Sequence, residues 1–301
     1  MSRRVVDLEG KSLSLTNLEK VLYPDCGFTK AHVLEYYRRM GPFILPHLQG
    51  RSLTLKRYPQ GVTGEFFFEK RCPVHRPPWV QTAEIHRSGG ETMTACLVND
   101  LPTLLWVANL ASLELHVPLA RAGSPGTADA MVFDLDPGEE ATILDCARVA
   151  LILRELLSRL GLASVLKTSG QKGLHVFVPL NRGETTFGDT KRFSRAVAMI
   201  LEKNYPELVT AKMAKSSRTG RVFINWSQND GSLTMVCAYS LRARNKPYVS
   251  CPLEWRELEL LAGRGDPEGF LVLPEEAIAR VEAKGDLFRE VLERTQHLPH
   301  L

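Results

Sequence analysis

Long apolar runs are missing from this sequence of 301 residues. None approaches the roughly 20 residues that a helix needs to span a bilayer, and the opening segment MSRRVVDLEGKSLSL lacks the apolar core of a signal peptide. Internal repeats and low-complexity linkers are missing as well. With 44% hydrophobic and 24% charged residues, the composition is that of a globular protein with one large domain or two associated lobes. We therefore expect a cytoplasmic protein with no membrane association.

Closely spaced cysteine pairs are also missing. Six cysteines stand singly along the chain and form no CxxC pair, so the ligand spacing of a zinc site is absent. In a reducing compartment we expect no structural disulfide. Cys72 and His75 could form half of a metal site, but no second pair stands nearby. We interpret them as a loop cysteine and a surface histidine.

The excess of basic over acidic residues is small. The net charge is +4 and the pI is about 8.7, which permits nucleic-acid binding without demonstrating it.

Apolar spacing and turn residues predict a mixture of helices and strands. Thr29 is placed to cap a helix that continues to about His47. Thr142 and Asp145 form a capping box for a helix that ends before Gly161. Further helices are expected over 102–116, 188–204 and 275–294. A strand and turn leading to Pro24 are expected over 12–24, short runs over 52–58 and 65–69, and strands over 131–135, 163–168, 174–180, 221–226 and 233–239. This alternation favours an α/β sandwich with one main sheet.

Two carboxylates stand two residues apart in the segment VFDLDP. Side chains two apart on a strand point to one face, so Asp134 and Asp136 converge at the end of a strand that Pro137 and Gly138 terminate. Carboxylates this close repel each other unless a divalent cation lies between them. Taken alone, the pair fits a cation site and a solvated strand end equally well.

A tight polar turn follows in KTSGQKGLHVFVPL, residues 167–180. Ser169, Gly170 and Gly173 form the turn, Lys172 projects from it, and His175 lies on the next strand. Backbone N–H groups in such a turn can bind phosphate oxygens. Glycine hairpins with a lysine are common, but beside a carboxylate pair this one predicts a triphosphate site.

The third polar segment is RVFINWSQNDGSLTMVCAYSLRAR, residues 221–244. Gln228, Arg242 and Arg244 are expected near a strand that neighbours the strand of the two aspartates. Arginine suits bidentate phosphate binding, although each of these could equally be a surface arginine.

Together these segments resemble the core motifs of the polymerase domain of bacterial end-joining ligases (ligase D), a branch of the archaeo-eukaryotic primase superfamily. The resemblance extends through LTNLEKVLYP, LKRYPQG, FFFEKRCP and LELHVP, and so covers nearly the whole chain. It implies an α/β (α+β) primase fold with an RRM-like catalytic sheet, forming a single primase-polymerase domain. The DNA-end-binding part would span 1–118, the catalytic part 119–270 and a C-terminal helix 271–301.

The resemblance also implies two-metal nucleotidyl transfer, often supported by Mn²⁺ (or Mg²⁺) and favouring ribonucleotides. One metal would activate the primer 3′-hydroxyl and the other would neutralise the triphosphate. The metal ligands would be Asp134 and Asp136. The groups holding the incoming nucleotide would be His116, Ser169, Lys172, His175, Gln228 and Arg242.

Contacts to DNA are implied in the same way. Lys20 and Lys30, with Lys56 or Arg57, would bind the template and the 5′-phosphate of a break. Phe67 and Phe68 would stack on bases, and Arg218 would touch the template. From the residues alone, His116 and either phenylalanine could be core residues, and Lys20 a solvated side chain.

One position departs from the family pattern. The third metal-binding carboxylate belongs in VFxDW, where this chain has Asn225. Asparagine keeps the shape and one carbonyl oxygen but removes a negative charge, so we expect poor binding of the metal that activates the 3′-hydroxyl. It could be a substitution that traps a substrate complex or the mark of a naturally inactive member.

Two functions remain open at this point. The first is a polymerase that fills gaps and extends ends in non-homologous end joining, with nucleoside triphosphates and gapped or broken 5′-phosphorylated DNA as partners. The second is a module that binds and aligns such ends without chemistry. A replicative primase fits less well, because LTNLEKVLYP and LKRYPQG match the end-joining branch. A ligase and an end-binding protein are the expected protein partners, at the nucleoid.

Overall fold

The structure, a computed structural model, describes residues 3–86, 90–181 and 183–299. The chain divides into two compact units, each assembled from three stretches of sequence. Unit 1 comprises residues 1–123, 234–249 and 273–285, and unit 2 comprises 124–233, 250–272 and 286–301.

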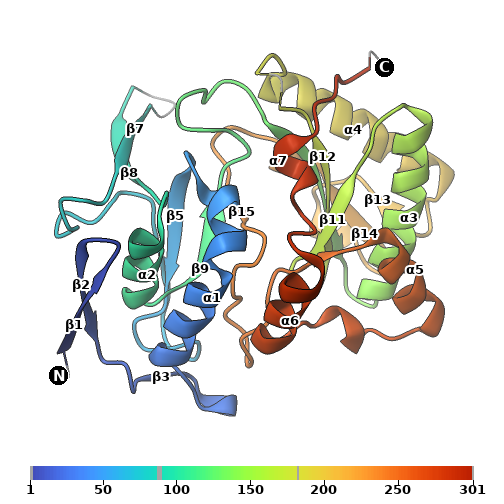
Figure 1. The fold of residues 1–301 in the computed structure, drawn as a ribbon. Coiled ribbons are helices and arrows are strands. Elements are labelled where there is room, and N and C mark those ends of the chain that lie inside the picture. The colour runs from blue at the N-terminus through green and yellow to red at the C-terminus, as the bar shows by residue number, and fades with distance from the viewer. Residues whose placement is uncertain (1–2, 87–89, 182, 300–301) are drawn as a thin grey trace. The chain divides into compact units, whose positions relative to one another are not determined.

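Unit 1 is built on a six-stranded sheet with the order β15-β9-β5-β8-β7, in which β6 also pairs with β5. Helices α1 and α2 pack against each other and α2 contacts β9 (Figure 1). Two hairpins, β1–β2 and β3–β4, complete the N-terminal part. The helices are α1 (Lys30–Leu48), α2 (Leu101–Asn109) and α6 (Pro274–Lys284). The strands are β1 (Arg3–Leu8), β2 (Lys11–Thr16), β3 (Val21–Tyr23), β4 (Phe28–Thr29), β5 (Ser52–Arg57), β6 (Phe67–Glu69), β7 (Thr82–His86), β8 (Thr92–Leu97), β9 (Ser112–Val117) and β15 (Met235–Val236).

Unit 2 is built on a second six-stranded sheet with the order β13-β14-β10-β12-β11-β16. The central strands β14, β10, β12 and β11 are antiparallel neighbours. The helices are α3 (Ile143–Arg159), α4 (Phe187–Asn204), α5 (Trp255–Arg264) and α7 (Glu290–Glu293). The strands are β10 (Ala130–Pro137), β11 (Val165–Thr168), β12 (Leu174–Pro179), β13 (Val209–Thr210), β14 (Val222–Asn225) and β16 (Pro252–Leu253).

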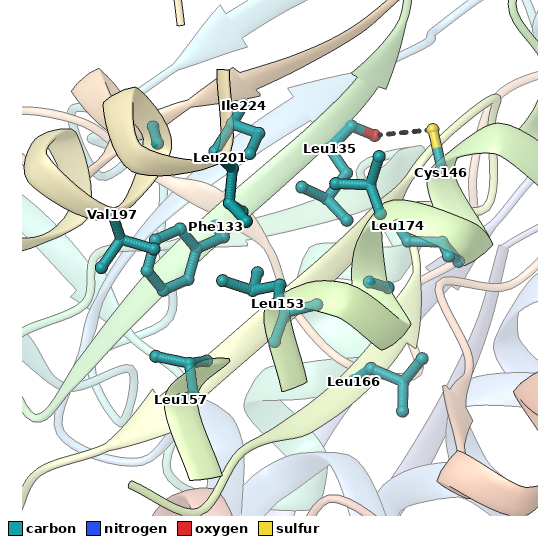
Figure 2. Close-up of a cluster of buried hydrophobic side chains, with 14 of the residues drawn as sticks. Phe133, Leu135, Cys146, Leu153, Leu157, Leu166, Leu174, Val197, Leu201 and Ile224 are labelled. Carbon is teal, nitrogen blue, oxygen red and sulfur yellow. Dashed lines mark hydrogen bonds between the residues drawn. The ribbon is translucent and has the colours of Figure 1, made fainter. Parts of the chain in front are cut away.

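One face of the unit 2 sheet carries its hydrophobic core. Because strand side chains alternate between faces, Phe133 and Leu135 of β10 point to the same side as Leu174 of β12 and Ile224 of β14. Figure 2 shows these side chains packed with residues of α3 and α4, and shows the Cys146 thiol directed at the Leu135 carbonyl. Asp134 and Asp136 therefore belong to the opposite face, away from this core.

Helix starts follow the predicted caps. The Thr29 hydroxyl accepts a hydrogen bond from the His32 N–H at 3.4 Å where α1 begins. At α3, the Asp145 carboxylate accepts from the Thr142 N–H at 2.9 Å and from its hydroxyl at 3.0 Å. Both predicted N-caps are confirmed.

The prediction of one main sheet is wrong, and so is the helix expected over 102–116. Helix α2 ends at Asn109, and Ala111, with φ of 59°, turns the chain into β9. Strand β9 pairs with β5 on one side and β15 on the other, so the segment SLELHV is a central strand of the unit 1 sheet. Gln228 follows β14, the neighbour of the aspartate strand β10, as expected, whereas Arg242 and Arg244 follow β15 and belong to unit 1.

The last predicted helix, over 275–294, is also interrupted. Helix α6 ends before Gly285, whose φ of 72° is left-handed, and only the short α7 follows at Glu290–Glu293. Glycine at this position ends the helix because its left-handed backbone carries no Cβ penalty.

The expectation of no structural disulfide is wrong as well. Cys72 and Cys96 are joined in unit 1, with their Cα atoms 4.9 Å apart. The Cys72 N–H donates to the Thr94 carbonyl at 2.8 Å, which places the segment after β6 beside β8. This cross-strand contact, which sequence spacing does not show, brings the two thiols together.

Helices that could cross a membrane are absent from the part of the chain that the structure describes.

Candidate active site

A row of polar residues crosses the four central strands of unit 2. Lys167, His175, Asp134 and Asn225 lie directly opposite one another on β11, β12, β10 and β14. Residues in register on neighbouring strands have side chains on the same face of a sheet. The row therefore occupies the face opposite the hydrophobic core.

Neighbouring members of this row are in contact. Lys167 Nζ lies 2.8 Å from His175 Nδ1, and His175 Nε2 lies 3.3 Å from Asp134 Oδ1. Asp134 Oδ2 accepts from Asn225 Nδ2 at 3.1 Å. Since an ammonium can only donate, His175 Nδ1 accepts from Lys167, and the N–H of the ring is Nε2, which points to Asp134. Lys167 is completely buried, and its ammonium also donates to the Ser250 hydroxyl at 2.6 Å.

Asp136 completes the carboxylate pair at the end of β10. Burial, and next the charge of Asp134, raise the pKa of Asp136 to about 7, an effect that nearby Arg218 partly offsets. Each carboxylate disfavours the charge of the other, and a divalent cation bound between them would relieve this repulsion. The role of Asp134 and Asp136 as metal ligands stays a prediction.

Two glycines allow the chain to approach this strand closely. A Cβ on Gly173 would lie 2.1 Å from the Leu135 carbonyl oxygen, and one on Gly138 would lie 1.9 Å from the Arg218 carbonyl oxygen. Any side chain at Gly173 would push the polar turn away from the carboxylates. These contacts explain why glycine stands at both positions.

The polar turn itself is closed by Ser169. Its hydroxyl accepts from the N–H groups of Gln171 and Gly173, each at 3.1 Å, so these two donors are already used within the turn. This changes the expected phosphate cradle: Ser169 orders the turn, while Lys172 is exposed and projects from it. Gln228 lies just beyond β14, in the short 3-10 helix Trp226–Gln228.

Asn225 stands where a third carboxylate was expected. Its amide nitrogen donates to Asp134, and its carbonyl oxygen accepts from the Ser227 hydroxyl at 2.7 Å. Asp134 and Asp136 are thus the carboxylates available to a cation here, whereas the Asn225 amide presents a donor, not a ligand atom, to Asp134. Among the described residues no group of three or more His, Cys, Asp or Glu side chains is placed to hold a metal.

Arg218 is packed against the sheet of unit 2. Its guanidinium lies 3.8 Å from the centre of the Phe223 ring and donates to the Met213 carbonyl at 2.7 Å. It also lies close enough to Asp136 to lower the pKa of that carboxyl.

The remaining predicted nucleotide groups, His116 and Arg242, belong to unit 1. Both contact the buried carboxylate of Glu114: His116 Nε2 lies 3.0 Å from Oε2 and Arg242 Nη2 lies 3.4 Å from it. Lys56 contacts the same carboxylate through Oε1, at 3.3 Å. His116 is thus the end of a short polar network and not an isolated core histidine.

Lys20, Lys30 and Arg57 form a basic cluster in unit 1. Lys30 is 5% exposed and contacts the Thr16 hydroxyl at 3.3 Å. Burial, and next the charges of Lys20 and Arg57, lower the pKa of Lys30 to about 8. Burial and two neighbouring cations destabilise the charged form of Lys30, and an anionic ligand would restabilise it.

Aromatic rings on β6 lie beside the cations of β5. Phe67 and Phe68 are 45% and 55% exposed, so neither is a core residue. Lys56 Nζ lies 5.6 Å from the centre of the Phe68 ring, and the Arg57 guanidinium lies 5.2 Å from that of Phe67. Exposed rings beside cations suit a nucleic-acid strand, whose bases stack and whose phosphates pair with the cations.

Two central residues were missed at the level of sequence, Lys167 and Glu114. Both are charged side chains that are completely buried. Lys167 precedes the TSGQKG turn by one residue and Glu114 precedes His116 by two, so their nearness to motif residues was the available signal. Their burial depends on partners from distant strands.

Comparison with known proteins agrees with this arrangement. Residues 29–288 match the family described as "LigD, primase-polymerase domain". The multifunctional non-homologous end joining DNA repair protein LigD of Mycobacterium tuberculosis (strain H37Rv) is 41% identical over 288 residues, which cover 93% of this chain and 37% of that protein. The corresponding protein of Mycolicibacterium smegmatis is 43% identical over 276 residues, covering 91% of this chain and 35% of its own length. The chain thus spans little more than a third of these relatives.

A solved structure supports the same assignment. The polymerase domain from Mycobacterium tuberculosis ligase D, in complex with DNA, superimposes with a TM-score of 0.86 at 39% sequence identity. The match covers 94% of this chain and 98% of that one, which confirms the expected primase fold. The chain belongs to the family of LigD primase-polymerase domains.

Proposed function

We propose that this chain is a template-dependent polymerase that adds nucleotides at gapped or broken DNA ends in non-homologous end joining. The observation that carries the proposal is the pair Asp134 and Asp136 at the end of β10, flanked in register by His175. The two units together would form one catalytic domain, with ribonucleoside triphosphates as the favoured substrates. A ligase and an end-binding protein are the proposed partners, at the nucleoid.

The residues of the candidate active site have different proposed roles. Asp134 and Asp136 would hold Mn²⁺ or Mg²⁺, which when bound would neutralise charge on the triphosphate and activate the primer 3′-hydroxyl. His175, held by Lys167, presents its Nε2–H toward the same place. Lys172, Gln228, His116 and Arg242 bind the nucleotide.

DNA is bound by a separate set of groups. The cluster of Lys20, Lys30 and Arg57 suits a 5′-phosphate, because burial and the charges of Lys20 and Arg57 destabilise the charged form of Lys30, which a bound phosphate would stabilise. Phe67 and Phe68 offer exposed faces for stacking. Lys56 and Arg218 add positive charge near the bound DNA strand. The similar mycobacterial polymerase domain was solved in complex with DNA, which supports DNA as the ligand.

Asn225 is proposed to slow the chemical step. Its amide nitrogen donates to Asp134 Oδ2 and so takes up an oxygen that a cation would bind. Nucleotide and DNA binding rest on other groups and should persist. The second candidate function, an end-binding and aligning module without chemistry, is favoured by this one observation.

Primer extension separates the two functions. Asn225→Asp should extend a primer across a gapped, 5′-phosphorylated duplex, with Mn²⁺ and ribonucleotides, at least about a hundredfold faster than the unchanged chain, since a metal ligand is restored. The added nucleotide should be complementary to the template. DNA affinity should change little between the two proteins.

A matched control is available in the same unit. Asn204→Asp adds the same charge at the exposed end of α4, where the Asn204 amide contacts the Ile200 carbonyl, and should leave extension unchanged. If Asn225→Asp binds gapped DNA and nucleotide yet remains inert, the polymerase function is wrong and the end-binding module replaces it.

A further inference from the structure

Glu114 is a completely buried carboxylate at the centre of unit 1. It lies on β9 between β5 and β15, and its two oxygens have different partners. Oε1 accepts from the Tyr58 hydroxyl at 3.1 Å and from the Ala243 N–H at 3.2 Å, and lies 3.3 Å from Lys56 Nζ. This oxygen therefore faces the strand that carries the DNA-binding cations.

The other oxygen serves the nucleotide-binding groups. Oε2 lies 3.0 Å from His116 Nε2 and 3.4 Å from Arg242 Nη2. Because an ionised carboxylate can only accept, the proton of the His116 ring lies on Nε2. The free ring nitrogen, Nδ1, is the atom through which His116 can meet a ligand, and it can donate to a phosphate only after taking up a second proton.

Glu114 stays ionised in this setting. Burial by itself would raise the pKa of Glu114, but the hydrogen bond from His116 and the charges of Arg242, His116 and Lys56 lower it to about 2. A buried carboxylate with this many donors is a fixed negative charge across the working pH range.

We propose that Glu114 is a positioning residue, which holds Lys56 through one oxygen and His116 with Arg242 through the other, and keeps His116 basic enough to be protonated when a triphosphate approaches. The part concerning the triphosphate rests on the proposed function, and the part concerning His116 does not. Glu114 itself touches neither nucleotide nor DNA in this role.

The charged groups that act on His116 come from three elements. Burial, the largest influence, lowers the pKa of His116, as do Arg242, which follows β15, and Lys56 of β5. Glu114 of β9 opposes them, and the net result is a pKa below the ordinary value. The Phe68 ring of β6 packs edge-on at 6.0 Å and carries no charge. Removing the charge of Glu114 leaves His116 with two cations, so its pKa must fall.

A histidine titration tests this without any ligand. NMR of the whole chain, with the His116 signal identified from a His116→Gln spectrum, should show the pKa of His116 in Glu114→Gln at least about one pH unit below that of the unchanged protein. Asp100→Asn is the matched control: Asp100 is a partly buried carboxylate of unit 1 that binds Lys11 at 2.8 Å. It should leave the His116 titration in place.

Nucleotide binding provides the second measurement. With a fluorescent ribonucleoside triphosphate and Mn²⁺, affinity should rise as the pH falls toward the pKa of His116. In Glu114→Gln that rise should move to lower pH, and affinity at neutral pH should fall about tenfold, the equivalent of one pH unit. An unchanged His116 titration and unchanged affinity in the folded variant would overturn the proposal.

The two proposals can fail separately. If the unchanged protein binds no nucleotide but the His116 shift occurs, the proposed function is wrong and the positioning role stands. Should Glu114→Gln not fold, Glu114→Asp keeps the charge on a shorter side chain. It should weaken nucleotide binding while moving the His116 pKa less than glutamine would, and wild-type values for both would overturn the proposal.

Discussion

In the basic cluster, Lys30 is the residue whose protonation should respond most to a bound phosphate. Its ammonium is buried beside Lys20 and Arg57, which together with burial lower its pKa to about 8. An amine is charged below its pKa and neutral above it. A bound phosphate dianion would favour the charged form, and the free protein would lose that form first as the pH rises.

We expect the protein to bind a gapped duplex with a 5′-phosphate more tightly than one with a 5′-hydroxyl. The ratio of the two affinities should be greatest at pH 7 and below, and should decline above about pH 8, as Lys30 loses its proton. Anisotropy titrations of the two gapped duplexes between pH 6.5 and 9.5 measure the ratio of their affinities. Lys20→Met should shift the decline to higher pH, because removing the Lys20 charge raises the pKa of Lys30. A ratio that stays constant up to pH 9.5 would contradict the assignment of Lys30.

Some residues of the candidate site could be predicted from the sequence, and others could not. Asp134, Asp136 and His175 were predicted to lie together, and they do, because strand spacing and a recognisable turn define their positions. Lys167 and Glu114 were not predicted, since charged residues are usually exposed and only their distant partners make burial tolerable. The Ser250 hydroxyl that accepts from Lys167 is 83 residues away.

At the scale of elements, β9 shows where apolar patterning is ambiguous. The run from Leu104 to Leu115 is nearly all buried, on both the helical and the strand portion. A continuous apolar run carries no periodicity that separates a helix from a central strand. The boundary lies at Ala111, whose left-handed backbone has no sequence signal of its own. Elements with clear caps or alternation, such as α1, α3, β10 and β12, were predicted correctly.

The Cys72–Cys96 disulfide gives a prediction for the strands it joins. It closes a loop of 24 residues, and reducing it should lower the free energy of unfolding by about 3 kcal/mol, because the unfolded chain regains freedom. Urea titrations with and without dithiothreitol measure the difference. The double variant Cys72→Ser, Cys96→Ser should be insensitive to the reductant, and Cys26→Ser, at an exposed free cysteine, should respond as the unchanged protein does. Equal unfolding midpoints of the unchanged protein in both conditions would show that the bond adds no stability.

For the whole molecule, the count of basic residues overstates the charge available to DNA. The net charge is only +4. Lys56 is already paired with Glu114, and Arg57 binds Glu69 at 2.8 Å. Cations that are neutralised within the protein release few counterions when they meet a phosphate. Among the unit 1 cations that we propose bind DNA, we therefore expect Lys20 and Lys30 to contribute most.

We expect the logarithm of DNA affinity to fall with the logarithm of salt concentration with a slope of about −2 to −3, shallower than the slope of about −4.5 that five free cations would give. Lys20→Met should reduce the slope by about 1, whereas Arg57→Met should change it less. Filter-binding measurements over a range of KCl concentrations give these slopes. A slope near −5, or equal effects of the two substitutions, would mean that the internal ion pairs open on binding.

The chain passes back and forth between the two units, and this limits which truncations can fold. Each unit consists of three stretches, so neither corresponds to a single continuous gene fragment. A truncation after residue 123 would remove β15 and leave β9 as an open sheet edge, with the apolar Leu113 and Leu115 among its residues. Open edges of this kind pair with other copies and aggregate. A stable version of one unit should therefore be sought by joining its three stretches through designed linkers, and not by trimming from the C-terminus.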